Sequence, residues 1–251
     1  MLILMNSQSE KDFLSHYSVH DYDVPLISVD MAIFTVQDNQ LKLLIVKRAE
    51  HPALGQWALP GGFIDVQKDH QLVDTARRKL LAKTGVDTAY LEQVETIGNA
   101  QRDPRGWSVT VAYFALINAQ ALAPGIAVEA ARWINVDTLS DISLAFDHQS
   151  IASRCLARLR NKVRYTALPT HLLPSTFTLT KLQTIFEIVL GHRVQKKSFR
   201  RRMLDSALLE PTGESQSGVT RPARLYRVNA EAQPYFFTRG FEGERKSPTS
   251  E

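Results

Sequence analysis

Two stretches near the start of the chain, residues 25–36 and 41–48, alternate between apolar and polar positions and are rich in β-branched residues. Alternation with a period of two is typical of half-buried β-strands. The two stretches are separated only by the short polar segment DNQ, residues 38–40. Because polar residues of this kind favour tight connections between paired strands, the pattern predicts a β-hairpin.

A loop rich in Gly and Pro, residues 50–62, precedes a segment with helical spacing. Within residues 70–85 the apolar residues Leu72, Ala76, Leu80 and Leu81 have helical spacing. Gly85 stands where helices commonly end, because glycine adopts the left-handed conformation of a C-cap without steric cost. The segment therefore predicts an amphipathic helix that ends at Gly85.

The remainder of the first half predicts further strands and a second helix. Residues 94–117 predict two strands around the turn RDPRG, and residues 130–140 predict another strand. Residues 147–165 predict a helix with one apolar stripe at Ile151, Cys155 and Leu159. Since helices and strands interleave without the regular rhythm of a βαβ fold, we expect an α/β class, with an α/β/α sandwich around a mixed sheet.

The region after residue 171 has a different pattern. Thr180 and Gln183 fit a capping box, and an apolar stripe at helical spacing then runs to Gly191, with members Leu182, Ile185, Phe186, Val189 and Leu190. Residues 195–210 are helical again after a short connection, and residues 208–214 and 221–228 favour a two-stranded ribbon. Two helices joined by a tight turn and followed by a ribbon predict a winged helix-turn-helix.

Charge divides the chain in the same way. Residues 1–150 hold 12 Lys and Arg against 18 Asp and Glu, whereas residues 151–251 hold 18 against 8. A basic second half favours contact with a polyanion. We therefore expect five parts: a lead-in at 1–21, a first domain at 22–150, a linker helix at 151–170, the winged helix at 171–230 and a tail at 231–251.

Composition excludes several classes of protein. The 251 residues, 44% hydrophobic and 22% charged, are typical of a globular chain. The apolar opening MLILM is too short for a signal peptide or a membrane span, so we expect no membrane contact. The single cysteine, Cys155, excludes an intrachain disulfide and a Cys-rich zinc site. These features indicate a protein of the reducing cytoplasm.

One segment resembles a known catalytic motif. The residues ALPGGF (58–63) and ARRKLLAKTGV (76–86) resemble the Nudix box, whose pattern is G-x5-E-x7-R-E-u-x-E-E-x-G-u with u apolar. The match covers the scaffold positions Gly62, Arg78, Leu80, Gly85 and Val86. The resemblance implies a Nudix fold for residues 22–150.

The acidic positions of that pattern are different here. The Glu of the Arg-Glu pair is Lys79, and the Glu-Glu pair is Ala82 and Lys83. The segment after Gly62 is two residues longer than the pattern, so the first acid falls near Asp69 or His70. Nudix hydrolases use these carboxylates to hold Mg²⁺ or Mn²⁺, and a lysine cannot replace an oxygen ligand. We expect no metal, no catalytic residue and no enzyme activity.

A diphosphate bound without metal needs other positive partners. Guanidinium groups match phosphate oxygens bidentately, and two of the candidates lie in the turn QRDPRG, which equally fits an exposed β-turn. Trp57 and Phe63 flank the glycines and fit either a ligand border or packing under the loop, and Asp147 equally fits a helix N-cap. The expected effector-binding residues are Arg48, Trp57, Gly61, Gly62, Phe63, Arg102, Asp103, Arg105 and Asp147.

The helix that begins near Gln195 carries a basic face. Phe199 and Met203 are spaced to face inward, which leaves the basic positions outward. Such a helix can enter the major groove, where Arg and Lys pair with guanine or hold phosphates; a solvated charged face is the plainer alternative. The expected DNA-binding residues are Lys196, Lys197, Ser198, Arg200, Arg201, Arg202, Arg221 and Arg224.

A Nudix module without its acids, followed by a winged helix, resembles the Nudix-related transcriptional regulators of bacteria over about residues 22–230. The resemblance implies a homodimeric repressor that binds palindromic operators of NAD-synthesis genes in double-stranded DNA. It also implies that ADP-ribose is the effector and releases the repressor, with no cofactor. Two alternatives stay open: a Nudix hydrolase of ADP-ribose or a related nucleotide with unusual metal ligands, and a nucleotide-binding adaptor whose basic part contacts RNA or an acidic protein.

Overall fold

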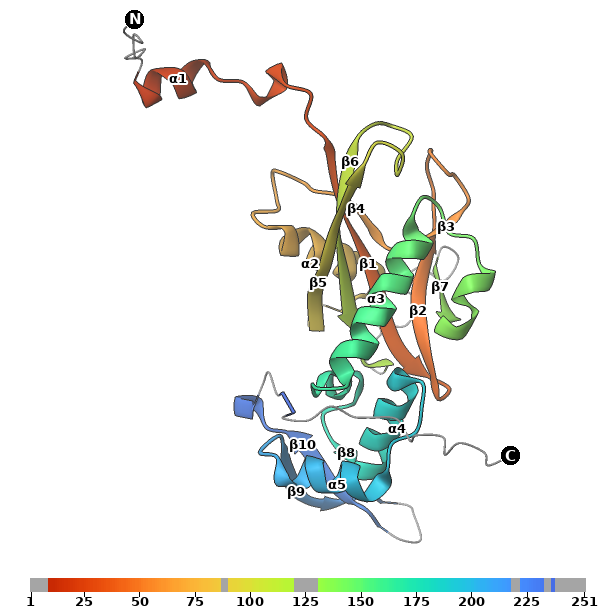
Figure 1. Cartoon of the computed structure of the whole chain (residues 1–251). Helices are drawn as coiled ribbons and strands as arrows, with labels where there is room; N and C mark the ends of the chain where they lie inside the picture. Colours follow the sequence, from red (N-terminus) through yellow and green to blue (C-terminus); the bar gives the residue numbers. More distant parts are fainter. Residues whose placement is uncertain (1–8, 87–89, 120–130, 218–221, 233–235, 238–251) are drawn as a thin grey trace, which may run out of the picture.

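The structure is a computed structural model that describes residues 9–86, 90–119, 131–217, 222–232 and 236–237. Figure 1 shows a sheet-based module above a smaller module of helices and a ribbon. The N-terminal helix α1, Glu10–His16, projects away from both modules. Short 3₁₀ helices connect several elements: Val19–Asp21, Val136–Asp141, Leu168–Leu172 and Ala230–Ala232.

The first module is built on a seven-stranded mixed sheet in the order β3-β2-β1-β6-β5, with β4 paired to β1 and β7 paired to β2. Strands β1 and β6 are parallel, and the other pairs are antiparallel. The mixed sheet confirms the expected α/β class. Its strands are β1 Leu26–Gln37, β2 Gln40–Lys47, β3 Trp57–Ala58, β4 Gly61–Phe63, β5 Tyr90–Asn99, β6 Ser108–Leu116 and β7 Ala131–Asn135.

The first hairpin has a shorter turn than the sequence predicts. Asp38 and Asn39 both have positive φ, at 53° and 56°, which is the conformation of a two-residue type I′ turn. Gln40 pairs with Gln37 and already belongs to β2. The prediction of a hairpin is therefore confirmed, with a loop of two residues instead of three.

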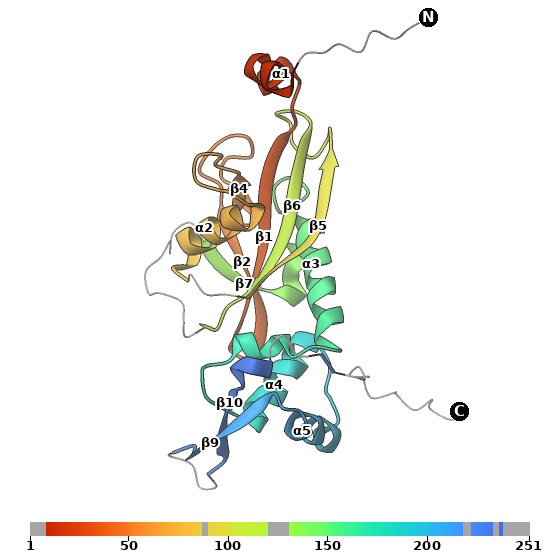
Figure 2. The same ribbon diagram turned by 90° about the vertical axis from the view of Figure 1, so that its left-hand side faces the viewer.

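Two helices cover opposite faces of the sheet, as Figure 2 shows: α2, Leu72–Thr84, and α3, His148–Val163. Alternate residues of β1 enter two separate cores. One core joins β1 to α2, through Val29, Met31, Ile33, Ala76 and Leu80. The other joins β1 to α3, through Ala32, Phe34, Ile151, Cys155 and Leu159. Because both faces are covered, β1 is buried at every position from Ser28 to Thr35.

Helix α2 ends as predicted, but two of its apolar positions are not buried. Gly85 adopts the left-handed conformation, with φ of 69°, and its N–H donates to the carbonyl of Leu81. Leu72 and Leu81 are 37% and 46% exposed. Of the four apolar positions with helical spacing, Ala76 and Leu80 are the ones that enter the core against β1. The predicted strand at 130–140 is also too long, since β7 ends at Asn135.

The second module is a winged helix-turn-helix, as predicted. Its helices are α4, Leu179–Leu190, and α5, Lys196–Asp205, and its small sheet has the order β8-β10-β9. The N-cap of α4 is Thr178, whose hydroxyl accepts from the N–H of Lys181 at 3.1 Å. The capping box predicted at Thr180 is wrong. The three strands are β8 Phe177–Thr178, β9 Leu209–Ser215 and β10 Arg224–Val228.

Helix α3 connects the two modules physically. One continuous apolar core extends from the sheet through α3 to α4 and α5. Arg160 of α3 donates to the carbonyl of Val189 at 3.3 Å, near the end of α4, and lies 3.7 Å from Asp137 of the first module. A displacement of α3 would therefore be felt by both modules. Among the described helices, none is long and apolar enough to cross a membrane.

Candidate functional site

A cleft of about 590 Å³ opens beside the Nudix-like motif. Its walls come from the end of β2, from β4, from α2, and from the segments that follow β5 and precede α3. The cleft brings together seven of the nine residues predicted to bind an effector, namely Arg48, Gly61, Gly62, Phe63, Arg102, Asp103 and Arg105. Residues far apart in sequence therefore converge on one concave surface, as ligand sites commonly do.

Arg102 is buried at the cleft and makes four hydrogen bonds to side chains. Its guanidinium donates two hydrogen bonds of 3.1 Å to the carboxylate of Asp147 and one of 3.3 Å to Asp30. It also donates to the hydroxyl of Ser108 at 3.4 Å. These bonds use four of the five N–H donors of the guanidinium, so it cannot also offer a two-pronged fork to a phosphate. Arg102 therefore shapes the floor of the cleft rather than offering a phosphate fork.

Asp30 is the centre of this buried polar cluster. Its carboxylate accepts from the hydroxyl of Thr110 at 2.8 Å, and the Nε2 atom of His148 lies 3.6 Å from it. His148 Nδ1 accepts from the N–H of Leu59 at 3.0 Å, so the ring proton is on Nε2 and faces Asp30. His148 thereby holds the strand that leads to Gly61 and Gly62 in position.

Arg105 and Asp103 form a second pair at the rim. Arg105 donates to both carboxylate oxygens of Asp103, at 3.0 and 2.6 Å. These hydrogen bonds hold the pKa of Asp103 below its ordinary value, and the same contact raises the pKa of Arg105. The guanidinium also lies 4.7 Å above the ring of Phe63. Unlike Arg102, the Arg105 side chain is 39% exposed and retains an edge toward the cleft.

Arg48 approaches the cleft from β2. It donates to the carbonyl of Pro52 at 2.7 Å and lies 4.7 Å above the ring of Phe146. Phe146 has a φ of 57°, a left-handed conformation that a bulky side chain rarely adopts. Strain of this kind persists where the surrounding structure enforces it, commonly at functional sites. Phe146 is thus a strained residue in the wall of the cleft.

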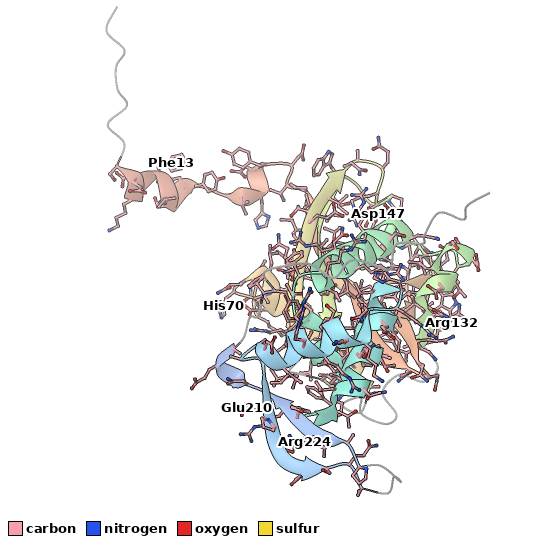
Figure 3. All side chains as sticks on the ribbon, turned by 60° about the horizontal axis from the view of Figure 1, so that its bottom comes forward. Phe13, His70, Arg132, Asp147, Glu210 and Arg224 are labelled. Atoms are coloured by element: carbon pink, nitrogen blue, oxygen red, sulfur yellow. The ribbon has the colours of Figure 1, made fainter. Side chains whose placement is uncertain are left out.

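Two predicted effector residues lie elsewhere. Trp57 packs at the edge of the core, with Arg132 4.3 Å above its ring, and does not line the cleft. Asp147 occupies the N-cap position of α3, but its carboxylate makes no capping hydrogen bond. It binds Arg102 instead, from behind the cleft wall. Figure 3 labels both Asp147 and Arg132, with Arg132 at the right-hand edge of the view.

The lysines of the Nudix-like motif line the cleft. Lys79, Ala82 and Lys83 all border it from α2. Gly62 has a φ of 143°, and a Cβ atom built there would lie 2.9 Å from Lys79 Nζ. A neighbouring glycine, Gly61, packs so closely on the backbone of β1 that any side chain would collide with Asp30. The two glycines therefore allow β4 to lie against β1 on one side and the lysine on the other.

The residues present do not fit the divalent metal that a Nudix fold implies. Asp69, at the expected first acidic position, accepts hydrogen bonds from Arg78 and Thr75, and its contact with Arg78 holds its pKa well below the ordinary range. Asp74 accepts from the N–H groups of the two residues before α2. Within the described part of the chain, no three His, Cys, Asp or Glu side chains are grouped to hold an ion.

The basic face of α5 is a second site. Lys196, Lys197 and Arg201 are exposed, and none has a carboxylate oxygen within 4.0 Å among the described residues. Phe199 and Met203 are buried, at 1% and 0% exposure, and hold α5 on α4. Because its inner face is anchored, the helix presents these cations on a rigid surface, as recognition helices do.

The other predicted DNA-binding residues have different positions. Ser198 is exposed beside the lysines, whereas Arg200 is half-buried and donates to the hydroxyl of Thr180 at 3.0 Å. Arg202 turns toward the ring of Phe237 at 5.7 Å. Arg224 is exposed on β10 (Figure 3). Arg221 lies outside the described residues.

Some cleft residues were not recognised from the sequence. Asp30 is an isolated acid in the otherwise apolar stretch ISVDMAIF, and that contrast is a signal for a buried functional charge. Ser28 also lines the cleft, and no local pattern distinguishes it, because it reaches the cleft through the pairing of β1 with β4. Phe146 and His148, which flank the predicted residue Asp147, line the cleft as well.

Known proteins match both modules. The model of the Nudix domain matches residues 27–159, and that of the NrtR DNA-binding winged helix domain matches residues 169–228. The chain is 50% identical, over 98% of both chains, to a protein of Acinetobacter baylyi named ADPR responsive transcriptional repressor NtrR.

Two solved structures of Shewanella oneidensis NrtR are also similar, each at 44% identity. The one complexed with a 27mer DNA has a TM-score of 0.81, covering 86% of this chain and 99% of that one. The one of the Nudix domain complexed with ADP ribose has a TM-score of 0.56, covering 60% and 99%. With its Nudix module, its winged helix and a relative this similar over its whole length, the chain belongs to the NrtR family of Nudix-related transcriptional regulators.

Proposed function

We propose that this protein is a cytoplasmic transcriptional repressor of NAD-synthesis genes. Its winged helix, residues 171–230, binds a palindromic operator in double-stranded DNA, and ADP-ribose bound in the Nudix domain, residues 22–150, releases it. Residues 151–170 link the two. The names of the relatives support the same two ligands here, since one responds to ADPR and the solved structures contain DNA or ADP ribose.

The observation that carries the proposal is the basic face of α5. Lys196, Lys197 and Arg201 are exposed cations on a helix that is anchored from behind by Phe199. DNA phosphates attract such groups and release bound counterions, and Arg or Lys side chains in the major groove read guanine. Exposed cations without a carboxylate partner are available for both kinds of contact.

The cleft supports ADP-ribose as the effector. Its volume of about 590 Å³ suits a ligand of nucleotide size. Arg48 and Arg105 lie on the wall over aromatic rings, and each keeps its positive charge near the ligand space. We propose that these two arginines contact the ligand directly, whereas Arg102 and Asp147 keep the floor in shape.

We propose that the protein acts as a homodimer, because a palindromic operator requires two recognition helices related by a two-fold axis. The arm formed by α1 and the residues after it supports an interface. Phe13, Leu14, Tyr17 and Tyr22 are 47–59% exposed on a segment that projects from the body (Figure 2). A contiguous exposed apolar surface usually has a partner.

Effector release follows from linkage between the two sites. ADP-ribose weakens DNA binding only if it binds more tightly to a conformation in which the two recognition helices are wrongly spaced. Helix α3 is the natural connection, since its N-terminus borders the cleft at His148 and its Arg160 contacts the end of α4. We propose that the effector moves α3 and thereby α4 and α5.

We also propose that the protein does not hydrolyse its effector. Hydrolysis by a Nudix enzyme needs a metal ion to orient the diphosphate and to activate water. The positions that would supply the ligands on α2 are Lys79, Ala82 and Lys83. The alternative of a hydrolase with unusual ligands predicts a ribose phosphate product that depends on added metal.

The first experiment is a titration of the full-length protein on a labelled promoter fragment from upstream of NAD-synthesis genes, with and without ADP-ribose. A scrambled duplex at the same salt concentration is the control, and the ligand is analysed for cleavage in added Mg²⁺. A specific complex that dissociates on adding intact ADP-ribose supports the proposal. Equal affinity for both duplexes, or cleavage of the ligand, overturns it.

A further inference from the structure

Two lysines occupy one face of α2 within the cleft. Lys79 and Lys83 are four residues apart, so their side chains lie on the same side of the helix. Both line the cleft, and Lys79 Nζ reaches the space beside Gly62. This face of α2 is where the metal-binding glutamates of the Nudix pattern would lie. The cleft therefore has two ammonium groups at the place of a divalent ion.

These lysines lack an internal counter-ion. Neither has a carboxylate oxygen within 4.0 Å among the described residues, which is also true of Lys47 and Arg48 at the cleft, whereas Arg102 and Arg105 of the cleft wall are paired with carboxylates. Both lysines are half-buried. Burial lowers the pKa of Lys79, and the neighbouring charges of Arg78 and Lys83 lower it further.

A bound anion would reduce the electrostatic repulsion between Lys79 and Lys83. Like charges four residues apart on a helix repel each other, and a half-buried ammonium has lost part of its hydration. The fold nevertheless holds both groups toward the same space, with Asp69 drawn away by Arg78 and Thr75. A diphosphate entering the cleft would supply the charge that the protein does not.

We propose that Lys79 and Lys83 replace the divalent cation and hold the diphosphate of the effector directly. The inference rests on the proposed function and specifies how the ligand is bound. Two ammonium groups carry the same formal charge as one divalent ion, and each donates hydrogen bonds to phosphate oxygens. An ammonium group cannot activate water as a metal does. The pair therefore binds the diphosphate and leaves it intact, as a sensor requires.

The test is calorimetric titration of ADP-ribose into the full-length protein, in EDTA and in Mg²⁺. The wild type is expected to bind with the same affinity in both buffers. The double variant Lys79→Gln with Lys83→Gln is expected to lose at least about tenfold in affinity, because two charge-assisted contacts are removed. Adenosine, which has no diphosphate, is expected to bind both proteins equally.

Two controls separate charge from folding. Lys68→Gln removes a lysine that is paired with Asp65 at 2.9 Å and lies outside the cleft, so it is expected to leave the affinity unchanged. Lys79→Arg with Lys83→Arg keeps both charges and is expected to retain most of the binding. Melting temperatures of all variants show whether the domain is folded.

The outcomes distinguish the inference from the proposed function. If the wild type binds ADP-ribose only in Mg²⁺, or if the glutamine pair binds as tightly as the wild type, the lysine pair does not replace the metal while the sensor function stands. If the wild type binds ADP-ribose in neither buffer, both the effector and the inference are overturned. Metal-independent binding that is lost in the glutamine pair alone supports the inference.

Discussion

The cleft of the Nudix domain and the outer face of α5 are both rich in arginine and lysine, but their cations have different partners. In the cleft, Arg102 and Arg105 are paired with carboxylates of the same chain. On α5, Lys197 and Arg201 have no carboxylate within 4.0 Å among the described residues. Arg102 and Arg105 are therefore neutralised within the chain, whereas Lys197 and Arg201 are not.

Whether a cation has a carboxylate partner in the same chain helps to separate cations that stabilise the fold from cations that are available to a ligand. A buried guanidinium between two carboxylates stabilises a fold and has little capacity left for a ligand. An exposed cation on an anchored helix contributes little to folding and remains available to an anion. Lys79 and Lys83 lie in the cleft, but like the cations of α5 they have no carboxylate partner among the described residues. This is why we propose that they bind the ligand.

The largest expected effect concerns Arg102. Arg102→Ala leaves Asp30 buried without its cation, and loss of one member of a buried pair costs about 3–5 kcal/mol. The melting temperature, measured by calorimetry, is expected to fall by roughly 10 °C. Arg105→Ala, which removes a pair that is 39% exposed on the arginine side, is expected to cost at most about 1 kcal/mol. Equal losses for the two variants would contradict the distinction between them.

If ADP-ribose releases DNA less well from Arg102→Ala, the cause would then be the loss of stability of the variant and not the loss of a contact with the ligand. The variant Arg48→Ala is the better test of direct contact, since the Arg48 side chain donates to loop carbonyls, has no carboxylate partner among the described residues and lies on the cleft wall. It is expected to weaken effector binding while changing the free energy of unfolding by less than about 1 kcal/mol.

The next effect concerns the basic face of α5. Lys197→Ala with Arg201→Ala is expected to weaken operator binding on the order of 100-fold without lowering the melting temperature. If both residues contact phosphates, the slope of log affinity against log salt falls by about 2. Fluorescence anisotropy on a labelled operator measures both quantities.

Arg227→Ala is the matched control in the same module. Arg227 is paired with Glu210 at 2.9 Å, and its loss is expected to change DNA affinity far less. A similar loss of affinity in this variant would mean that pairing does not distinguish the DNA-binding cations.

A smaller effect tests the helix that supports the basic face. Thr178→Ala removes the N-cap of α4 and is expected to cost about 1 kcal/mol of stability. Thr180→Ala, at the position that sequence reasoning selected, leaves that cap in place and frees only Arg200. Thermal melting of the two variants is expected to show a loss for the first alone, and the reverse result would refute the assigned cap.

The smallest effect is on the dependence of stability on pH. Arg78 holds the pKa of Asp69 well below its ordinary value, so this carboxylate stabilises the folded state above the unfolded pKa of about 4. That contribution is lost as the pH falls below 4 toward the folded pKa. The melting temperature of Asp69→Asn is therefore expected to fall less than that of wild type between pH 5 and pH 3.

Tryptophan fluorescence is a suitable signal, because all three tryptophans, Trp57, Trp107 and Trp133, lie in the Nudix domain. Asp38→Asn is the control, since Asp38 is 81% exposed in its pair with Lys42. It is expected to show the same pH dependence as wild type. An unchanged pH dependence in Asp69→Asn would remove Asp69 as a stabilising group.

Much of the architecture could be predicted because its signals are local. The hairpin, the C-cap at Gly85 and the anchored face of α5 each depend on residues within a few positions of one another. The predictions differed from the structure where a local pattern was compatible with two arrangements. Leu72 and Leu81 have helical spacing in α2, but both are exposed. Thr180 fits a capping box, but α4 begins two residues earlier, with Thr178 as its N-cap.

By itself the sequence determined the two modules, the lysines at positions 79 and 83 of α2 and the basic face of α5, since each is a matter of residue identity and spacing. Only the tertiary structure decided which cations are neutralised. Arg102 meets Asp30 and Asp147 from positions 72 and 45 residues away. Sheet register and helix packing decide which residues become partners of this kind. The sequence around a charged residue does not show which side chain will lie opposite it in the fold.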